Sequence, residues 1–310
     1  MRIWSIFLVF QGIQSTISGR HSLQYFYTAS SGIHSFPEFV AVGLVDGNQF
    51  MYYDSSIKKA IPKQDWMKKV TEDDPQYWDF QTHKLSRTQM SFMNSIEAAK
   101  QRFKQTGGVH IFQNMYGCEF DDEYEDVQGW ENFGYDGEDF IAFDLETQRW
   151  SAPVHQALIT KNKWDDDKRK TALTNNYITQ TCPDWLKNYL DYGKNSLLKT
   201  DVPSVSLLQK SPSSPVCCFA TGFYPSRAEM FWRRDEEEIH DGVDKREILP
   251  NNDRTFQMSV YIDLSSVPTE DWTKYECVFQ LLGLKDDLVF KLEKTQILSN
   301  YGENKMRTEG

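Results

Sequence analysis

Two acidic runs, WDDDK (164–168) and DDEYED (121–126), carry the side chains that could bind a metal ion or catalyse acid–base chemistry. Carboxylates at successive positions of a helix point in different directions, so they do not converge on one ligand. We therefore expect both runs to be solvated surface. We also expect the run RRDEEEIHDG (233–242) to form a solvated loop.

The remaining polar residues do not form an enzyme signature. The histidines have no HExxH or other paired metal spacing, and GGVH (107–110) lacks a P-loop lysine. No Ser/His/Asp order stands out. The formal net charge of -11 argues against a nucleic-acid partner, which needs basic surface. We predict neither an enzyme nor a cofactor. The six scattered histidines are His21, His34, His83, His110, His155 and His240.

The stretch TNNYITQTCPDWLKNYLDYGK (174–194) combines aromatic groups with a cysteine and a proline. Cys182, Trp185 and Tyr189 follow i, i+3, i+7 spacing and so share one face of a helix. Proline fits the first turn of a helix, where its missing N–H is not needed. This predicts a break near residues 180–182, with a new helical segment starting at Pro183.

The chain begins with Met1 and the basic residue Arg2, followed by an apolar run (IWSIFLVFQGI) and small residues, which is the layout of a secretory signal peptide over 1–19. The run is too short to span a bilayer, and no later stretch is long and apolar enough to do so. A secretory context favours disulfides. Five cysteines leave one over after two pairs.

Two blocks of the sequence repeat the order of strands followed by a long helical region. In the first, HSLQYFYTAS places Leu23, Tyr25 and Tyr27 on one face of a strand, VDG marks a hairpin turn, and residues 75–103 turn helical before TGG. In the second, VHIFQNMYGCEF and a YDG turn precede a helical region that ends at Gly193. Two such blocks joined edge to edge predict one wide antiparallel sheet with two helices on one face.

The third block has the immunoglobulin pattern. Cys218 is followed by Trp232, and Cys277 is preceded two residues earlier by Tyr275. Cys217 and Cys218 point to opposite faces of a strand, so only one of them faces a core.

Together these segments resemble the heavy chains of the major histocompatibility complex (MHC) class I family, with classical, bony-fish-like features. The resemblance covers residue 21 to about residue 293. Its carriers are HSLQYFYTASS, FVAVGLVDGNQF, PQYWD, MYGCEF, YDGEDFIAF, KNKW, TCPDWLKNYLDYGK and CCFATGFYPSRAEMFW. The implied fold is α+β, an eight-stranded antiparallel sheet topped by two long helices plus an immunoglobulin C1-type sandwich. The implied domains are alpha-1 (20–107), alpha-2 (108–199), alpha-3 (200–293) and a connecting tail (294–310).

The resemblance implies a groove that binds a short peptide by its two ends. Phenol oxygens accept hydrogen bonds from a buried ammonium without adding charge, and cations bind a terminal carboxylate. Arg102 stands where mammalian members usually have Tyr and non-mammalian classical members have Arg. The residues implied at the amino-terminal end are Tyr25, Tyr77, Tyr177, Trp185 and Tyr189. Those implied at the carboxyl-terminal end are Arg102, Thr160, Lys163 and Trp164.

Further positions follow from the same match. The implied groove pockets are formed by Tyr27, Gln81, Lys84, Thr88, Ser91, Phe92, Ser95, Phe112, Asn114, Tyr116, Glu131 and Phe133. Gln113 and Asp139 are implied contacts with beta-2-microglobulin. The implied disulfides are Cys118–Cys182 and Cys218–Cys277. Cys217 is then a free thiol, either buried in the sheet or available for intermolecular pairing.

The function that the resemblance implies is antigen presentation to T-cell receptors, with beta-2-microglobulin and a short peptide as partners. The acidic loop from Glu236 to Asp244 is a further expected contact for the T-cell co-receptor. The expected location is the secretory pathway and cell surface, with no transmembrane anchor in this sequence. The alternatives are a non-classical relative that holds a lipid or metabolite, and a receptor ligand that binds no peptide.

Overall fold

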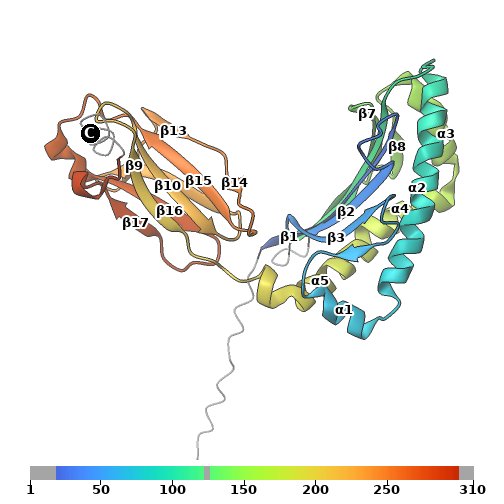
Figure 1. Ribbon diagram of the computed structural model, residues 1–310, viewed down its shortest axis with the longest axis horizontal. Helices are drawn as coiled ribbons and strands as arrows, with labels where there is room; N and C mark the ends of the chain where they lie inside the picture. Colours follow the sequence, from blue (N-terminus) through green and yellow to red (C-terminus); the bar gives the residue numbers. More distant parts are fainter. Residues whose placement is uncertain (1–18, 122–125, 300–310) are drawn as a thin grey trace, which may run out of the picture. The chain divides into compact units, whose positions relative to one another are not determined.

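The computed structural model describes residues 19–121 and 126–299 and divides into two compact units, Met1–Leu197 and Leu198–Gly310 (Figure 1). Each unit has its own hydrophobic core. The predicted signal peptide up to residue 18, the acidic residues 122–125 and the end of the predicted tail (300–310) lie outside the described residues. Among those described, no helix is long and apolar enough to cross a membrane.

The first unit contains an antiparallel sheet of eight strands in the order β4-β3-β2-β1-β5-β6-β7-β8. Its central pair is β1 and β5, which joins the two halves that the sequence repeat predicted. Leu23, Tyr25 and Tyr27 are all buried on one face of β1, as their alternation predicted. The strands are β1 (Arg20–Ser31), β2 (Phe39–Val45), β3 (Asn48–Asp54), β4 (Ile61–Pro62), β5 (His110–Asp121), β6 (Asp126–Tyr135), β7 (Glu138–Asp144) and β8 (Arg149–Ser151).

The two halves also repeat a hydrogen-bond pattern. His21 Nδ1 lies 2.7 Å from Asp46 Oδ2 in the first half, and His110 Nδ1 lies 2.9 Å from Asp136 Oδ2 in the second. In each half the other carboxylate oxygen accepts the backbone N–H of the residue after the histidine, at 2.8 and 2.9 Å. Each Asp begins an Asp-Gly turn with φ near +50°. In the sequence, each of these histidines stands 25 or 26 residues before the Asp of an Asp-Gly pair.

The helices of this unit cover one face of the sheet (Figure 1). The first half contributes α1 (Met67–Asp73) and α2 (Tyr77–Arg102). The second half contributes a short 3-10 turn η1 (His155–Ala157), α3 (Leu158–Asp166), α4 (Lys168–Asn176), the π-helical segment η2 (Tyr177–Thr181) and α5 (Cys182–Leu197).

Asp166 and Asp167 are exposed, as we expected for the WDDDK run, but two acids of this run also have structural roles. Asp167 separates α3 from α4 and accepts a hydrogen bond from Lys170 N at 3.0 Å, which caps α4. Asp165 accepts hydrogen bonds from Trp150 N at 2.9 Å and from Lys161 Nζ at 2.6 Å.

The predicted break before Pro183 takes a different form. The new helix α5 begins at Cys182, so Pro183 does lie in its first turn. However, the chain stays helical through η2, whose wider turns replace the expected interruption. The physical reason is that proline has no N–H for a normal i→i−4 bond, and a π-type turn accommodates the unused carbonyl group without leaving the helix.

Gly193 was predicted to end this helical region, but α5 continues to Leu197. The glycine is buried, and a Cβ atom there would lie 2.6 Å from Leu197 Cδ1 and 3.3 Å from the ring of Trp66. Gly193 therefore permits close packing of α5 on the segment that leads into α1, and it does not act as a helix stop.

The second unit is a sandwich of two antiparallel sheets, β13-β15-β10-β9 with β14 beside β15, and β12-β11-β16-β17. The Cys218–Cys277 disulfide joins β10 to β16, and fully buried Trp232 donates its indole N–H to Val260 O at 3.1 Å. The immunoglobulin pattern is thereby confirmed. The strands are β9 (Ser204–Gln209), β10 (Val216–Phe223), β11 (Ala228–Arg234), β12 (Glu237–Glu238), β13 (Val243–Lys245), β14 (Leu249–Pro250), β15 (Phe256–Ile262), β16 (Tyr275–Leu281) and β17 (Leu288–Lys291).

The structure of this unit answers two questions that the sequence left open, the state of Cys217 and the structure at the start of the tail. Cys217 forms no disulfide and is buried, so the thiol is not presented for intermolecular pairing, and burial raises its pKa. Leu298, in the predicted connecting tail, forms a parallel bridge with Leu208 of β9 and donates its N–H to Leu207 O at 2.8 Å. The first residues of that tail are therefore hydrogen-bonded to the sandwich.

Candidate functional site

The structure brings together the five aromatic residues expected at the amino-terminal end. Tyr77 begins α2 and Tyr189 lies on α5, and their hydroxyl groups share a hydrogen bond of 2.6 Å. The ring of Trp185 lies 6.0 Å from that of Tyr77 and 5.4 Å from that of Tyr189. Tyr25, from the sheet, is hydrogen-bonded to Tyr189. Residues 112 positions apart in the chain thus converge on one cluster of hydroxyl groups.

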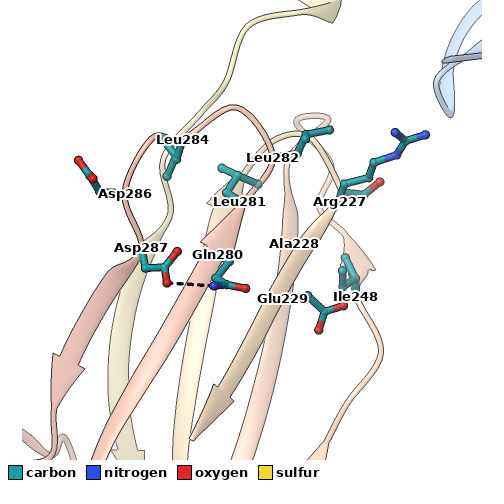
Figure 2. Close-up of a pocket in the computed structure, with 11 residues that line it drawn as sticks. Arg227, Ala228, Glu229, Ile248, Gln280, Leu281, Leu282, Leu284, Asp286 and Asp287 are labelled. Atoms are coloured by element: carbon teal, nitrogen blue, oxygen red, sulfur yellow. Dashed lines mark hydrogen bonds between the residues drawn. The ribbon is translucent and has the colours of Figure 1, made fainter. Parts of the chain in front are cut away.

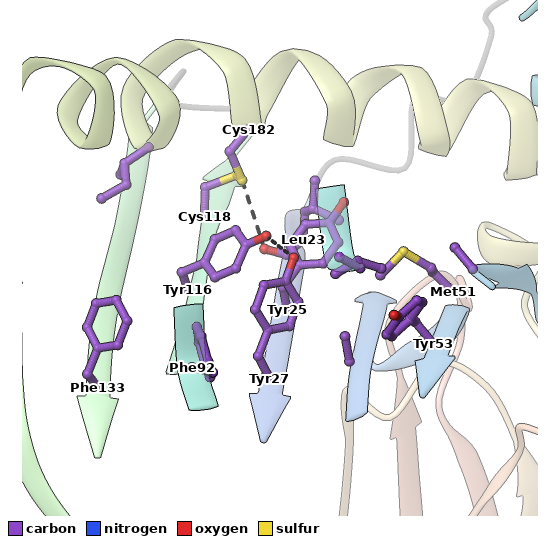
Figure 3. Packing of buried hydrophobic residues seen from close by; sticks show 14 of the residues in the cluster. Leu23, Tyr25, Tyr27, Met51, Tyr53, Phe92, Tyr116, Cys118, Phe133 and Cys182 are labelled. Atoms are coloured by element: carbon purple, nitrogen blue, oxygen red, sulfur yellow. Dashed lines mark hydrogen bonds between the residues drawn. A yellow bond between two sulfur atoms is a disulfide. The ribbon is translucent and has the colours of Figure 1, made fainter. Parts of the chain in front are cut away.

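The cluster continues along the sheet through Tyr116 (Figure 3). Its ring stacks on that of Tyr25 at 5.0 Å, and its hydroxyl group shares a 2.6 Å hydrogen bond with Tyr27. Tyr177 of η2 lies edge-on to Tyr116, with ring centroids 5.4 Å apart. We call Tyr25, Tyr77, Tyr116, Tyr177 and Tyr189 the tyrosine cluster.

Burial raises the pKa of every residue in the tyrosine cluster above its ordinary value of 10. Each hydroxyl group is therefore neutral at physiological pH and can both donate and accept hydrogen bonds. Such a cluster can bind an ammonium group, because its neutral hydroxyl oxygens accept hydrogen bonds from the ammonium N–H groups without adding a negative charge.

Two residues that support the cluster were missed in the sequence. The Tyr189 ring contacts Phe50 of β3 at 4.8 Å and Trp66 at 5.8 Å. Both are buried, and their only sequence signal is that they are large apolar residues. Their role depends on how α5 crosses the first-half strands, which no local pattern encodes.

The Cys118–Cys182 disulfide ties β5 to the first residue of α5 across a sequence separation of 64 (Figure 3). Both cysteines are fully buried. The bridge fixes the start of the helix that carries Trp185 and Tyr189.

At the other end of α2, its last residue Arg102 reaches the second half. One terminal nitrogen, Nη1, donates to Thr160 Oγ1 at 2.6 Å and to Gln156 O at 3.4 Å. Among the described residues, its Nη2 and Nε form no hydrogen bond, so part of the guanidinium group has donors available. Lys163 is exposed one turn beyond Thr160 on α3.

Trp164 completes this end by packing, with its ring 4.6 Å from Trp150 and 5.3 Å from Phe133. Lys170 of α4 lies 4.1 Å from the centroid of the Trp164 ring. The sequence did not single out Lys170, because an exposed-looking lysine on a helix carries no distinctive signal.

The expected pocket residues divide into two groups. Phe92, Phe112 and Phe133 form a chain of ring contacts at 5.3 and 5.9 Å, and all three are buried in the core. Asn114 is buried and donates to Asn132 O at 3.0 Å. On α2, Thr88 and Ser95 donate to carbonyl groups of their own helix, while Gln81 and Lys84 are partly buried and Ser91 is exposed.

Glu131 of β6 is the acid among these residues. Its carboxylate accepts a hydrogen bond from Thr174 Oγ1 at 3.0 Å. Burial raises the pKa of Glu131, and the nearby charge of Lys170 partly offsets that rise. Glu131 therefore has its partners within the second-half helices.

The two residues expected to contact beta-2-microglobulin are exposed. Gln113 lies between buried Phe112 and Asn114 on β5, so it points to the face of the sheet away from the helices. Asp139 is exposed on β7.

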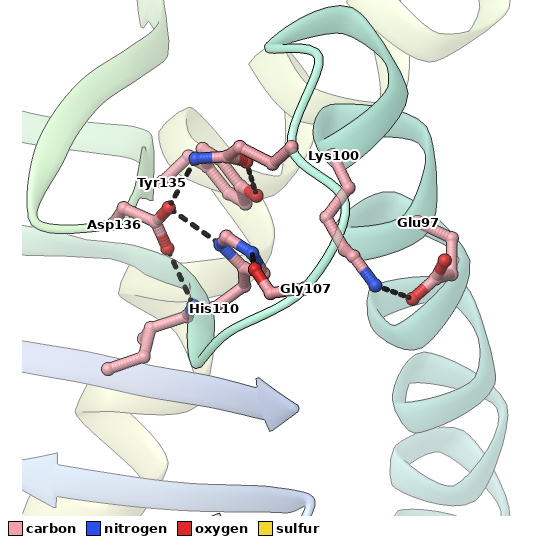
Figure 4. A network of polar contacts seen from close by, with 8 residues as sticks. Glu97, Lys100, Gly107, His110, Tyr135 and Asp136 are labelled. Atoms are coloured by element: carbon pink, nitrogen blue, oxygen red, sulfur yellow. Dashed lines mark hydrogen bonds and ion pairs between the residues drawn. The ribbon is translucent and has the colours of Figure 1, made fainter. Parts of the chain in front are cut away.

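A polar network holds the loop that follows α2 (Figure 4). His110 Nδ1 meets Asp136 Oδ2 and His110 Nε2 lies 3.0 Å from Gly107 O. Both partners are acceptors, so both contacts are hydrogen bonds only in the imidazolium form. Gln105 donates to Asp136 at 3.2 Å and accepts from Tyr135 at 2.7 Å. The network fixes the chain just after Arg102.

Replacing Asp136 with Asn is expected to lower the free energy of unfolding by about 1–2 kcal/mol at pH 6. Burial raises the pKa of Asp136, but hydrogen bonds from Ile111 N and His110 outweigh it and leave the pKa lowered. A lowered folded-state pKa stabilises the fold above the unfolded value of about 3.9, and this contribution is lost as pH falls through the folded value. Thermal unfolding between pH 6 and pH 2 should show the mutant deficit disappearing at the acidic end. Glu138→Gln, an exposed change on the next strand, is the control, and an equal deficit for it would contradict the assignment.

Other surface features do not form a comparable site. In the second unit a hollow of about 590 Å³ lies where β11 begins and β16 ends (Figure 2), and Gln280 there donates to Asp287 at 2.9 Å. None of the binding-site residues implied by the family resemblance lines it. In the described ranges, no three His, Cys, Asp or Glu side chains are grouped as a metal site requires. The acidic segment from Glu236 to Asp244 was expected to be a loop, but it contains the short strand β12 and the start of β13; most of it is exposed.

Comparison with known proteins agrees with this geometry. The family profile described as Class I Histocompatibility antigen, domains alpha 1 and 2, matches residues 19–197, and the Immunoglobulin C1-set domain profile matches residues 202–283. The chain is 35% identical to the H-2 class I histocompatibility antigen, K-K alpha chain, of Mus musculus, covering 90% of this chain and 75% of that one. It is 33% identical to the class I histocompatibility antigen, F10 alpha chain, of Gallus gallus (89% and 79% covered). It is 34% identical to the major histocompatibility complex class I-related protein 1 of Rattus norvegicus (86% and 76% covered). This chain therefore belongs to the MHC class I family of alpha chains.

Proposed function

We propose that this protein binds short peptides between α2 and the α3–α5 helices and displays them to T-cell receptors. Class I proteins are cell-surface, antigen-presenting proteins that pair with beta-2-microglobulin and peptide, and they are not enzymes. For this chain, peptide binding rests on the residues at the two ends of α2. The exposed positions Gln113 and Asp139 are the proposed beta-2-microglobulin contacts, and the loop from Glu236 to Asp244 is the proposed co-receptor contact.

The observation that carries the proposal is the placement of complementary chemistry at both ends of one helix. Tyr77, in the tyrosine cluster, is the first residue of α2, and Arg102, with donors available, is its last. An α-helix rises 1.5 Å per residue, so these residues lie about 37 Å apart along the axis. An extended chain covers about 3.3–3.6 Å per residue. Allowing for the reach of both side chains, a peptide of about eight to eleven residues spans the site.

The proposal predicts that peptide binding depends on a free terminal carboxylate. A peptide acid should bind about tenfold or more tightly than the same peptide with a C-terminal amide, because charge-assisted hydrogen bonds contribute about 1.5–3 kcal/mol each. In the Arg102→Ala, Lys163→Ala double variant the two should bind within about threefold of each other. Competition binding to the complex refolded with beta-2-microglobulin measures both.

Lys168→Ala removes an exposed cation from the neighbouring helix and is the matched control. It should keep the preference for the acid. A complex with beta-2-microglobulin that is equally stable with and without a peptide pool would contradict peptide presentation. That result would favour the alternatives, a lipid- or metabolite-holding relative or a receptor ligand.

A further inference from the structure

Lys170 connects the helices α3 and α4 across the break between them. The break lies at Asp167, whose φ of -79° and ψ of 84° are not helical. The ammonium nitrogen of Lys170 lies 4.1 Å from the ring centroid of Trp164 on α3 and 4.9 Å from that of Trp150 on β8. Residues six apart on a continuous helix lie about 9 Å apart along its axis and about 120° apart around it. The contact between Lys170 and Trp164 therefore depends on the angle at which α3 and α4 meet.

The position of α3 depends strongly on how Trp164 is held. No residue of α3, which lies wholly within the described part of the chain, is fully buried. The Trp164 ring provides its aromatic contacts, 4.6 Å from Trp150 and 5.3 Å from Phe133, and the adjacent Asp165 accepts a hydrogen bond from Trp150 N. Thr171 Oγ1 of α4 donates to Trp164 O at 3.3 Å, so a second contact crosses the break at the same residue.

The charge of Lys170 lies among two indole rings and one acid. Lys170 is partly buried, whereas Lys168 and Arg169 just before it are exposed. Burial raises the pKa of Glu131 on β6, and the charge of Lys170 opposes that rise. A cation is attracted to the negative face of an indole ring, and the attraction is stronger where water is partly excluded. An uncharged side chain of similar length would fill the same space without this attraction.

We propose that Lys170 is a positioning residue that sets the angle between α3 and α4 and so places the α3 residues that bind the carboxyl-terminal end of the peptide. This inference rests on the proposed function. Thr160, Lys163 and Trp164 all lie on α3, so a tilt of this short helix at Asp167 would move all three relative to α2. The peptide's carboxylate would then be bound less tightly, although Lys170 forms none of the contacts proposed for it.

The test compares Lys170→Met, which keeps an unbranched side chain but removes the charge, with Lys170→Arg, whose guanidinium group can stack on an indole ring. The first measurement is hydrogen exchange of the α3 amides in the complex with beta-2-microglobulin. Exchange should be about threefold or more faster in Lys170→Met, as expected for the loss of a cation–π contact, and within about twofold of the wild type in Lys170→Arg.

The second measurement is the affinity of a nonapeptide acid and of its C-terminal amide for the same complexes. The acid-to-amide affinity ratio should fall about threefold or more in Lys170→Met and stay within about twofold of the wild type in Lys170→Arg. The affinity for the amide should change little in either variant, because the residues placed by Lys170 bind the carboxylate.

Arg169→Met is the matched control, since it removes one positive charge from the exposed position next to Lys170. It should leave both the exchange of α3 and the acid-to-amide ratio unchanged. An unchanged exchange rate or an unchanged ratio in Lys170→Met would overturn this inference alone, and so would equal losses in Lys170→Met and Lys170→Arg. A wild type that binds the acid and the amide equally would overturn the proposed carboxylate site and the inference together.

Discussion

Replacing Cys118 and Cys182 together with alanine is expected to lower the free energy of unfolding by about 4 kcal/mol. The two residues close a loop of 64 positions, for which the chain-entropy model gives about this loss. Because Cys182 is the first residue of α5, the loss should extend to Trp185 and Tyr189, and peptide should dissociate faster. Thermal unfolding and peptide dissociation of the complex with beta-2-microglobulin measure the two effects.

Cys217→Ala is the control for that experiment, since it removes a buried cysteine that forms no disulfide. It should cost much less stability and leave peptide dissociation unchanged. A double variant that unfolds within about 1 kcal/mol of the wild type would mean that packing of α5 against α1 and β1 alone holds the helix in place.

Tyr189→Ala is expected to cost about 3–5 kcal/mol, the range for removing a large buried aromatic ring. The side chain is 1% exposed and packs against Phe50, Trp66 and Trp185. Tyr189→Phe keeps the ring and removes only the hydrogen bonds that its hydroxyl group shares with Tyr77 and Tyr25, so it should cost about 1–2 kcal/mol.

Peptide binding separates the two roles of Tyr189. If its hydroxyl group helps to bind the peptide's ammonium group, Tyr189→Phe should weaken a peptide with a free amino terminus more than the same peptide with an acetylated one. Chemical denaturation gives the stability of both variants, and competition binding gives the peptide preference. An equal loss for both peptides would assign Tyr189 a packing role only.

The strands and the immunoglobulin unit were predictable because their signals are local or nearly so. The alternation around Tyr25 has a period of two, the Asp-Gly pairs mark turns, and Cys218, Trp232 and Cys277 recur at a recognisable spacing. The residues at the two ends of the site came from the family resemblance. Without that resemblance, the pattern of residues predicted only blocks of strands followed by helices.

The errors occurred where backbone geometry depends on contacts that are distant in sequence. Pro183 signalled an interruption correctly, but its form, a π-helical segment, reflects how η2 is held over Tyr116 and β6. Gly193 looked like a helix stop, yet its small size is required by Leu197 and Trp66. The structural roles of Asp165 and Asp167 were missed because their partners, Trp150 N and Lys170 N, are backbone groups without a sequence signature.

The sequence by itself determined the sheet-and-helix blocks, the sandwich and the types of groups available for binding, since these depend on periodicity and side-chain chemistry. Only the tertiary structure decided which groups meet. Tyr77 and Tyr189 are 112 positions apart and Arg102 and Thr160 are 58 apart, so their contacts depend on how helices cross a sheet. The burial of Lys84 likewise depends on the rotation of α2 about its axis, which sets whether a lysine faces water or the rings of Tyr25 and Tyr116.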